Sequence, residues 1–262
     1  MNSAEENIKE RIRNEGWITF AEFMKLALYG PGGYYTQGQP IGSGGDYYTS
    51  PVAHSAFGAL IVLQLEQMWA LMGGPEAFQV VEMGAGDGVL ASDILAYALH
   101  LDPGFYRALT YTAVDVNPRP NSSVSSEKLQ WMKSATLPIR GINGCVISNE
   151  LVDSLPVHRV RVRNGKLEEL YLLVDHDAIT EVWNSPSTPA LAQRLADDEG
   201  TLAEGWEGEI GLSAASWMAQ VGQALTRGYA LTVDYGDTVE RLYTSERSRG
   251  TVTSYFRHTQ QA

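Results

Sequence analysis

The stretch that decides the fold is VVEMGAGDGVLASDIL, residues 80–95. It predicts the end of an apolar strand, a tight turn with glycines at 84, 86 and 88, and the start of a helix. Glycine lets the backbone turn sharply and lets a ligand lie against the main chain, while the helix N-terminus offers free N–H groups. In an open α/β sheet, ligands bind at this carboxyl edge of the strands. The stretch therefore predicts a binding site as well as a fold.

On either side of this turn, apolar strands alternate with helices. Strands are predicted at residues 78–83, 110–115, 144–149 and 229–236, and helices at 52–72, 89–100 and 217–225. Strands that are apolar along their whole length and separated by helices are typical of parallel βαβ units. We therefore predict an α/β fold with a doubly wound, Rossmann-like parallel sheet.

One segment interrupts this alternation. Asn164-Gly165 lies between the strand-like runs 157–163 and 167–174, which is a strong signal for a β-hairpin. We expect the hairpin to be an antiparallel addition to the sheet. Residues 185–210 are polar and carry Gly and Pro, so we expect a surface excursion with one short helix near 189–196.

The N-terminal part has a different composition. Helices are predicted at residues 4–14 and 19–28, the second with Thr19 as N-cap and Glu22 completing a capping box. Residues 29–50 then contain seven glycines and five tyrosines, which excludes a long helix or a central strand and indicates a functional loop. We assign residues 1–75 to N-terminal helices and a Tyr/Gly-rich lid, and residues 76–262 to the core.

Composition excludes several classes of function. With 31 acidic and 19 basic residues the net charge is −12, which disfavours nucleic acid and anionic membranes and favours cationic partners. No apolar run is long enough to span a membrane, and the N-terminus resembles neither a secretion signal nor a transit peptide. Cys145 is the single cysteine, so no internal disulfide can form. We expect a cytoplasmic protein.

Two acids indicate which ligand the glycine turn binds. Glu82 stands two residues before the first glycine, and the run is G-x-G-x-G rather than the G-x-G-x-x-G of dinucleotide sites. A carboxylate there repels a pyrophosphate and suits a ligand with an ammonium or sulfonium group. Asp115 ends the next strand, where it can accept hydrogen bonds from ribose hydroxyls. This arrangement favours S-adenosyl-L-methionine; the alternative is a tight turn with a solvated Glu82 and a helix-capping Asp115.

A second group of polar residues follows the strand at 144–149. Asn149 and Glu150 lie at the strand end, and Asp153 follows within one turn. Two carboxylates three residues apart could share one face of a helical turn and clamp the planar donors of a guanidinium. Alternatively, Asp153 caps a turn ahead of Pro156 and Glu150 is a surface acid.

The remaining candidates have structural interpretations. His158 begins a strand, which favours a structural hydrogen bond over a role as general base, and His54 begins a helix, which favours capping. Cys145 lies within an apolar strand and is expected to be an inert buried thiol. The histidines show no metal-ligand spacing, so we predict no metal.

Five blocks together resemble the MidA-like class I methyltransferases, a family that includes a mitochondrial complex I assembly factor. The blocks are residues 29–58, 80–95, 148–160 (SNELVDSLPVHRV), 231–236 (LTVDYG) and 250–258 (GTVTSYFRH). The resemblance implies an S-adenosylmethionine-dependent protein arginine methyltransferase that makes symmetric dimethylarginine, with a subunit of respiratory complex I as the target in mitochondrial members. The family pattern continues past the last block, so we expect this chain to be shortened at its C-terminus relative to the family.

The resemblance also implies roles for individual residues. The cofactor would be held by Glu82, Gly84 and Gly86. The pocket would be lined by Asp46, Thr49, Ser50 and Pro51, and the reacting nitrogen would be faced by Asn149 and Glu150. Two other classes of function stay open: a nicotinamide-dependent oxidoreductase, and a non-catalytic assembly factor that keeps the fold. The sequence makes no prediction of oligomeric state.

Overall fold

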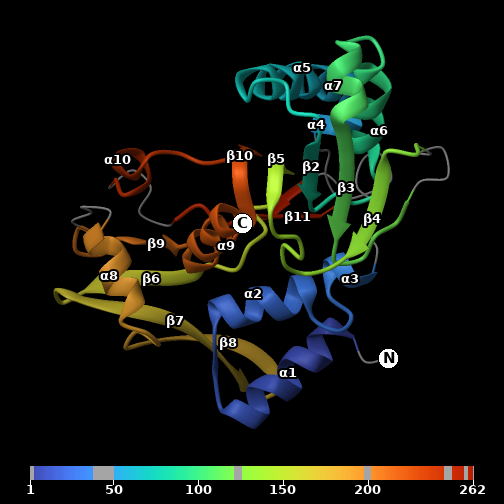
Figure 1. Cartoon of the computed structure of the whole chain (residues 1–262). Helices are drawn as coiled ribbons and strands as arrows, with labels where there is room; N and C mark the ends of the chain where they lie inside the picture. Colours follow the sequence, from blue (N-terminus) through green and yellow to red (C-terminus); the bar gives the residue numbers. More distant parts are fainter. Residues whose placement is uncertain are drawn as a thin grey trace.

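The computed structural model describes residues 3–37, 50–120, 126–197, 202–244, 250–256 and 259–261. At its centre lies a five-stranded parallel sheet in the order β10-β5-β2-β3-β4 (Figure 1). Its strands are β2 (Phe78–Met83), β3 (Leu109–Asp115), β4 (Leu129–Lys133), β5 (Ile142–Asn149) and β10 (Leu225–Val233). The chain runs outward from β2 in both directions, as expected for a doubly wound sheet.

Helices cover both faces of this sheet. On one face, Val80 and Tyr111 pack with α5 (Ala56–Leu71), α6 (Val89–Ala98) and α7 (Pro103–Ala108). On the other, Val81 and Val146 pack against Trp217 of α9 (Leu212–Ala224). Because side chains alternate along a strand, a strand buried on both faces must be apolar throughout. The predicted fold class is confirmed.

In the central sheet and the helices that cover it, the structure adds two elements that the sequence did not indicate. β4 lies at one edge of the sheet and is only partly buried, so its residues lack a continuous apolar pattern. α7 spans only six residues, which is too short for helical periodicity to be recognised. The predicted strands and helices of the core differ from the observed ones mainly at their ends, where periodicity is least informative.

The inserted hairpin is antiparallel, as predicted, but it is part of a second sheet, so the expectation that it adds to the parallel sheet is wrong. β6 (His158–Arg163) and β7 (Lys166–Asp175) form the predicted hairpin, with Asn164 and Gly165 both in the left-handed region. The other strands are β1 (Ile18–Thr19), β8 (Ala178–Asn184) and β9 (Glu207–Ile210). The expectation of an irregular excursion over residues 185–210 is therefore wrong at its end, because β9 pairs with β6, whereas α8 (Ala190–Asp197) confirms the short helix.

The N-terminal helices pack on this second sheet (Figure 1). α1 (Ala4–Glu15) buries Ile8 and Ile12 against Leu172 of β7. α2 (Phe20–Tyr29) has Thr19 as its N-cap, as predicted, with the Thr19 hydroxyl accepting the N–H of Glu22 at 3.2 Å, but the Glu22 side chain does not complete the predicted capping box. Both helices are thus held by tertiary contacts, not by propensity alone.

Short elements complete the described chain. They are α3 (Tyr34–Gln37), α4 (Ser50–Ala53), α10 (Val239–Leu242) and the hairpin of β11 (Ser254–Phe256) with β12 (Thr259–Gln261). Residues 38–49 of the expected lid lie outside the described residues. Within the described ranges, no helix combines the length and the apolar character needed to cross a bilayer.

Candidate functional site

A cavity of about 770 Å³ lies at the carboxyl ends of the parallel strands. Its wall includes the glycine turn after β2, the ends of β3 and β5, and the first turns of α9. Lys25, Tyr29 and Tyr35 of the N-terminal part contribute to the same wall. The cavity therefore brings the predicted ligand turn and the segment after β5 into one space.

The glycine turn adopts a backbone that only glycine accommodates without strain. Gly84, Gly86 and Gly88 have φ of +76°, +57° and +84°. The N–H of Gly84 is already used, because it donates to Val114 O at 2.9 Å. A Cβ on Gly86 would meet no atom within 4 Å, so this glycine leaves open space beside the main chain. The turn is built for close approach of a ligand.

Glu82 is buried beside this turn and lines the cavity. Its Oε2 accepts the hydroxyl hydrogen bond of Tyr111 at 2.9 Å. Burial, which outweighs that hydrogen bond and is reinforced by the negative charges of Asp115 and Asp87, raises the pKa of Glu82 to about 8. A cationic ligand group would offset this cost, so the site favours one next to Glu82.

Asp115 also lines the cavity, and it holds the glycine turn in place. One carboxylate oxygen accepts the N–H of Gly86 at 2.9 Å, and the other accepts the N–H of Asn117 at 2.8 Å. A carboxylate has about four acceptor positions, so these two bonds leave capacity for ligand hydroxyls. Asp115 thus binds the glycine turn and Asn117 rather than the first turn of a described helix, so the alternative of a helix-capping Asp115 is wrong, while its role toward the ligand stays a prediction.

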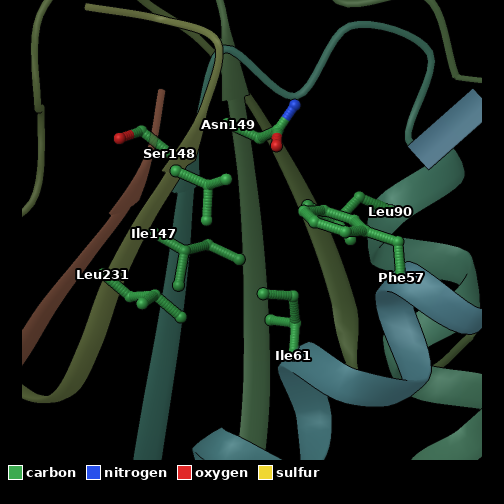
Figure 2. A pocket seen from close by; sticks show the side chains of 8 residues that line it. Phe57, Ile61, Leu90, Ile147, Ser148, Asn149 and Leu231 are labelled. Carbon is green, nitrogen blue, oxygen red and sulfur yellow. The ribbon is translucent and has the colours of Figure 1, made fainter. Parts of the chain in front are cut away.

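The segment after β5 contributes Asn149 and Glu150 to the cavity wall. Asn149 Nδ2 donates to Glu150 Oε1 at 3.3 Å. Asn149 Oδ1 is buried and has no hydrogen-bond partner among the described residues. Figure 2 shows this amide at one end of a small apolar pocket between Ile147, Leu90 and Phe57. The unused acceptor is available to a ligand donor.

Asp153 does not join Glu150 in the cavity wall formed by described residues. Residues 150–154 form an irregular turn rather than a helical one, because Glu150 has a φ of +48°. The predicted two-carboxylate clamp on one helical face is therefore not formed. Asp153 is exposed, yet partial desolvation, followed by the charges of Asp234 and Glu150, raises its pKa to about 6.

Two residues that hold this turn were not singled out from the sequence. The hydroxyl of Tyr29 lies 2.7 Å from Ser154 Oγ, which ties α2 to the turn. Asp234, directly after β10, accepts the N–H of Val152 at 2.7 Å. Both residues lie in blocks that resemble the methyltransferase family, but the local sequence of those blocks does not indicate that either residue contacts the turn.

The predicted pocket residues from the Tyr/Gly-rich segment are only partly described. Pro51 lines the cavity and is buried. Ser50 begins α4, and its side chain lies outside the described part, as do Asp46 and Thr49 altogether. These three assignments stay predictions.

The residues interpreted as structural have structural contacts. His158 Nδ1 lies 2.7 Å from Oε1 of the buried Glu169. His54 Nδ1 accepts the N–H of Ala56 at 2.9 Å, as expected for a helix start. Cys145 is buried, and burial raises the pKa of its thiol to about 12. The described residues contain no group of three or more His, Cys, Asp or Glu side chains suited to a metal ion.

Comparisons with known proteins agree with this geometry. Residues 60–262 match the model of the family Methyltransf_28, whose description is "putative S-adenosyl-L-methionine-dependent methyltransferase". The human protein arginine methyltransferase NDUFAF7, mitochondrial, is 29% identical over 258 residues, which cover 86% of this chain and 57% of the relative. The zebrafish (Danio rerio) protein of the same name is 31% identical over 269 residues, which cover 88% and 61%. The chain thus spans little more than half the length of these curated relatives.

A solved structure shares the fold. It is a COG1565 superfamily member from Burkholderia thailandensis, bound to S-adenosyl-homocysteine. It superposes with a TM-score of 0.83 at 25% identity, and the match covers 98% of this chain and 68% of that one. A native structure of a COG1565 superfamily protein from the same organism gives a TM-score of 0.80 at 26% identity.

Proposed function

Because this chain belongs to the family of S-adenosyl-L-methionine-dependent methyltransferases that its residues 60–262 match, we propose that it transfers a methyl group to an arginine nitrogen of a protein. The observation that carries the proposal is one continuous cavity. It joins a buried carboxyl group beside a glycine turn, Glu82, to an acid at a strand end, Glu150. The names of the relatives support arginine as the methylated side chain.

The donors and acceptors in the cavity fit the cofactor. Glu82 offers a carboxyl group for an ammonium or sulfonium, and Asp115 keeps acceptor capacity for ribose hydroxyls. Gly86 leaves open space beside the main chain, and Asn149 Oδ1 is a buried acceptor without a partner in the described structure. When bound, S-adenosyl-L-methionine supplies the methyl group on a positively charged sulfur. The related structure with S-adenosyl-homocysteine supports the same assignment.

The chain's own residues orient the substrate. Glu150 presents a carboxylate in the cavity wall, and Asn149 holds one of its oxygens at 3.3 Å. A carboxylate matches the planar donors of a guanidinium and orients the nitrogen to be methylated. As the N–CH3 bond formed and the S–CH3 bond broke, that nitrogen would lose one proton, which the Glu150 carboxylate could accept. Correct alignment supplies much of the rate enhancement of a methyl transfer. Tyr29 and Tyr35 line the same cavity, where their rings would limit the access of water to the reacting nitrogen.

The test separates cofactor binding from turnover. Calorimetric titration with S-adenosyl-homocysteine should show micromolar binding that is lost in Glu82→Ala and kept in Glu150→Gln. Methyl transfer to arginine peptides should be lost in both variants. Glu76→Gln, an exposed glutamate ahead of β2 and outside the cavity wall, is the matched control and should behave as the unmodified protein.

Other outcomes point to the remaining candidates. A folded protein that binds NADH but not S-adenosyl-homocysteine would indicate an oxidoreductase. Tight binding of a partner protein without cofactor affinity would indicate an assembly factor without turnover. Full activity of Glu150→Gln would show that the role given to Glu150 is wrong.

Finer features of the substrate rest on the resemblance alone. We propose symmetric dimethylarginine as the product, a respiratory complex I subunit as the target, and a cytoplasmic location. Mass spectrometry of arginine-containing proteins from cells with and without the gene would identify the methylated protein. Fragment spectra that show asymmetric dimethylarginine, or a target outside complex I, would overturn these assignments.

A further inference from the structure

The turn after β5 places Glu150 in the cavity through an unusual backbone conformation. Glu150 has a φ of +48°, in the left-handed region. For a residue with a Cβ this conformation is unfavourable. Such a conformation persists only where the surroundings hold it. The groups that hold the turn therefore decide where the Glu150 carboxylate lies.

Asp234 holds the turn from the neighbouring strand. Its Oδ2 accepts the N–H of Val152 at 2.7 Å and the N–H of Asp153 at 3.3 Å. Its Oδ1 accepts the N–H of Tyr235 at 2.8 Å, which fixes the carboxylate itself. The N–H of Glu150 donates to Val233 O at 2.9 Å, so the parallel pairing of β5 with β10 continues up to the strained residue.

The turn is also in contact with the cofactor loop. A Cβ added to Gly84 would lie 3.1 Å from Leu151 Cδ1, so the Leu151 side chain fills the space beside Gly84. At the end of the turn, Ser154 is hydrogen-bonded to Tyr29. A shift of the turn would therefore move Glu150 relative to the glycine turn of the cofactor site.

The anchor is charged, although a neutral acceptor could bind the same N–H groups. Its charge adds to those of Glu150 and Asp153, and it contributes to the raised pKa of Asp153. Placing these like charges close together is unfavourable until a cation is near. A guanidinium bound beside Glu150 would reduce this repulsion.

We propose that Asp234 is a positioning residue, whose carboxylate sets the location of Glu150 by binding the backbone N–H groups of Val152 and Asp153. Asp234 is not part of the described cavity wall, so it acts through the turn. The inference rests on the function proposed above. It adds a residue on which the reaction depends, although this residue does not contact the substrate or the cofactor.

The experiment compares Asp234→Ala with Asp234→Asn in the full chain. Ala removes both the acceptor and the charge, whereas Asn keeps one acceptor oxygen and removes only the charge. For Asp234→Ala we expect faster amide hydrogen exchange at Val152 and Asp153 and a change in the Cα chemical shift of Glu150. We expect kcat for methyl transfer to fall about 10- to 100-fold, while affinity for S-adenosyl-homocysteine stays within about twofold. Asp234→Asn should restore most of the protection and part of kcat.

Glu204→Ala is the matched control. Glu204 also holds a turn with its carboxylate, which accepts the N–H groups of Asn164 and Gly165 at 2.7 and 3.0 Å, and none of these three residues is part of the described cavity wall. It should lower stability without changing kcat. If Asp234→Ala only lowers the melting temperature and leaves kcat and the Glu150 shift unchanged, the proposal is overturned. If the unmodified protein methylates no arginine, the proposed function fails, while hydrogen exchange and the Glu150 shift still decide whether Asp234 positions the turn.

Discussion

The hydroxyl of Tyr111 donates a 2.9 Å hydrogen bond to Oε2 of Glu82, and both side chains are buried next to the cavity. Tyr111 on β3 and Glu82 on β2 lie on the same face of the sheet, where the hydroxyl donates to the carboxyl group. One hydrogen bond does not replace full hydration, so the carboxyl group keeps its proton up to a pH of about 8.

Binding of S-adenosyl-homocysteine should therefore release a proton at neutral pH. The ligand's ammonium favours the ionised form of Glu82, whose pKa in the free protein is about 8. Affinity should rise with pH up to that value, approaching about tenfold per pH unit, and then level off. Titration calorimetry at pH 7 in buffers of different ionisation enthalpy measures the released proton. Equal affinity at pH 6 and pH 8, without proton release, would contradict the role of Glu82.

Glu82→Gln should make the free protein more stable at high pH. Because the pKa of Glu82 is raised from 4.5 to about 8, the folded state holds a proton over this window that the unfolded state has lost. The contribution of protonated Glu82 to the free energy of unfolding is thus present at low pH and is lost as the pH rises through about 8. The difference in melting temperature between the variant and the unmodified protein should grow from pH 5 to pH 9. A constant difference would be inconsistent with a buried, titrating Glu82, and Glu76→Gln should show no such trend.

Gly84→Ala should destabilise the protein and weaken cofactor binding. A left-handed φ of +76° costs alanine about 1–2 kcal/mol, and the new Cβ would also meet Leu151 at 3.1 Å. Gly165→Ala is the control, because its φ is +67° but nothing lies within 4 Å of the Cβ position. Urea unfolding should show a larger loss for Gly84→Ala. In the double variant, Leu151→Ala should recover part of the extra stability that Gly84→Ala loses. If the effects of the two substitutions on the free energy of unfolding simply add, a contact between residues 84 and 151 is not supported.

Asp115→Ala should lower the affinity for S-adenosyl-homocysteine by about tenfold or more, because a charged acceptor of a hydrogen bond contributes about 1.5–3 kcal/mol. The change frees the N–H of Gly86 and removes an acceptor from the cavity wall. Asp115→Asn keeps one acceptor and should lose less. Asp102→Ala tests specificity: this carboxylate binds the N–H groups of Gly104 and Phe105 at the start of α7. Asp102→Ala should lower the stability of the protein, whereas calorimetry should find unchanged affinity for S-adenosyl-homocysteine. If Asp102→Ala lowered this affinity as much as Asp115→Ala does, general destabilisation would explain the loss in both variants.

Much of the fold and one half of the site follow from local sequence. Apolar runs separated by helices predict the parallel sheet, and three glycines in five residues require a turn that other residues cannot adopt. Glu82 and Asp115 could be placed because each ends a strand of a parallel sheet, and such ends share one edge. The second sheet was only partly predicted, since β8 and β9 are short or partly exposed and form through pairing with β7 and β6.

The other half of the site was decided by contacts between residues far apart in the chain. Asp234 binds a turn 82 residues earlier, and Tyr29 binds a residue 125 positions later. The left-handed backbone of Glu150 depends on such partners, and it directs Glu150 into the cavity while Asp153 stays outside the described wall. Periodicity and spacing report only on neighbours within a few residues. The sequence therefore determined the sheet and the glycine turn, whereas the tertiary structure alone decided which acid of the turn after β5 lines the cavity.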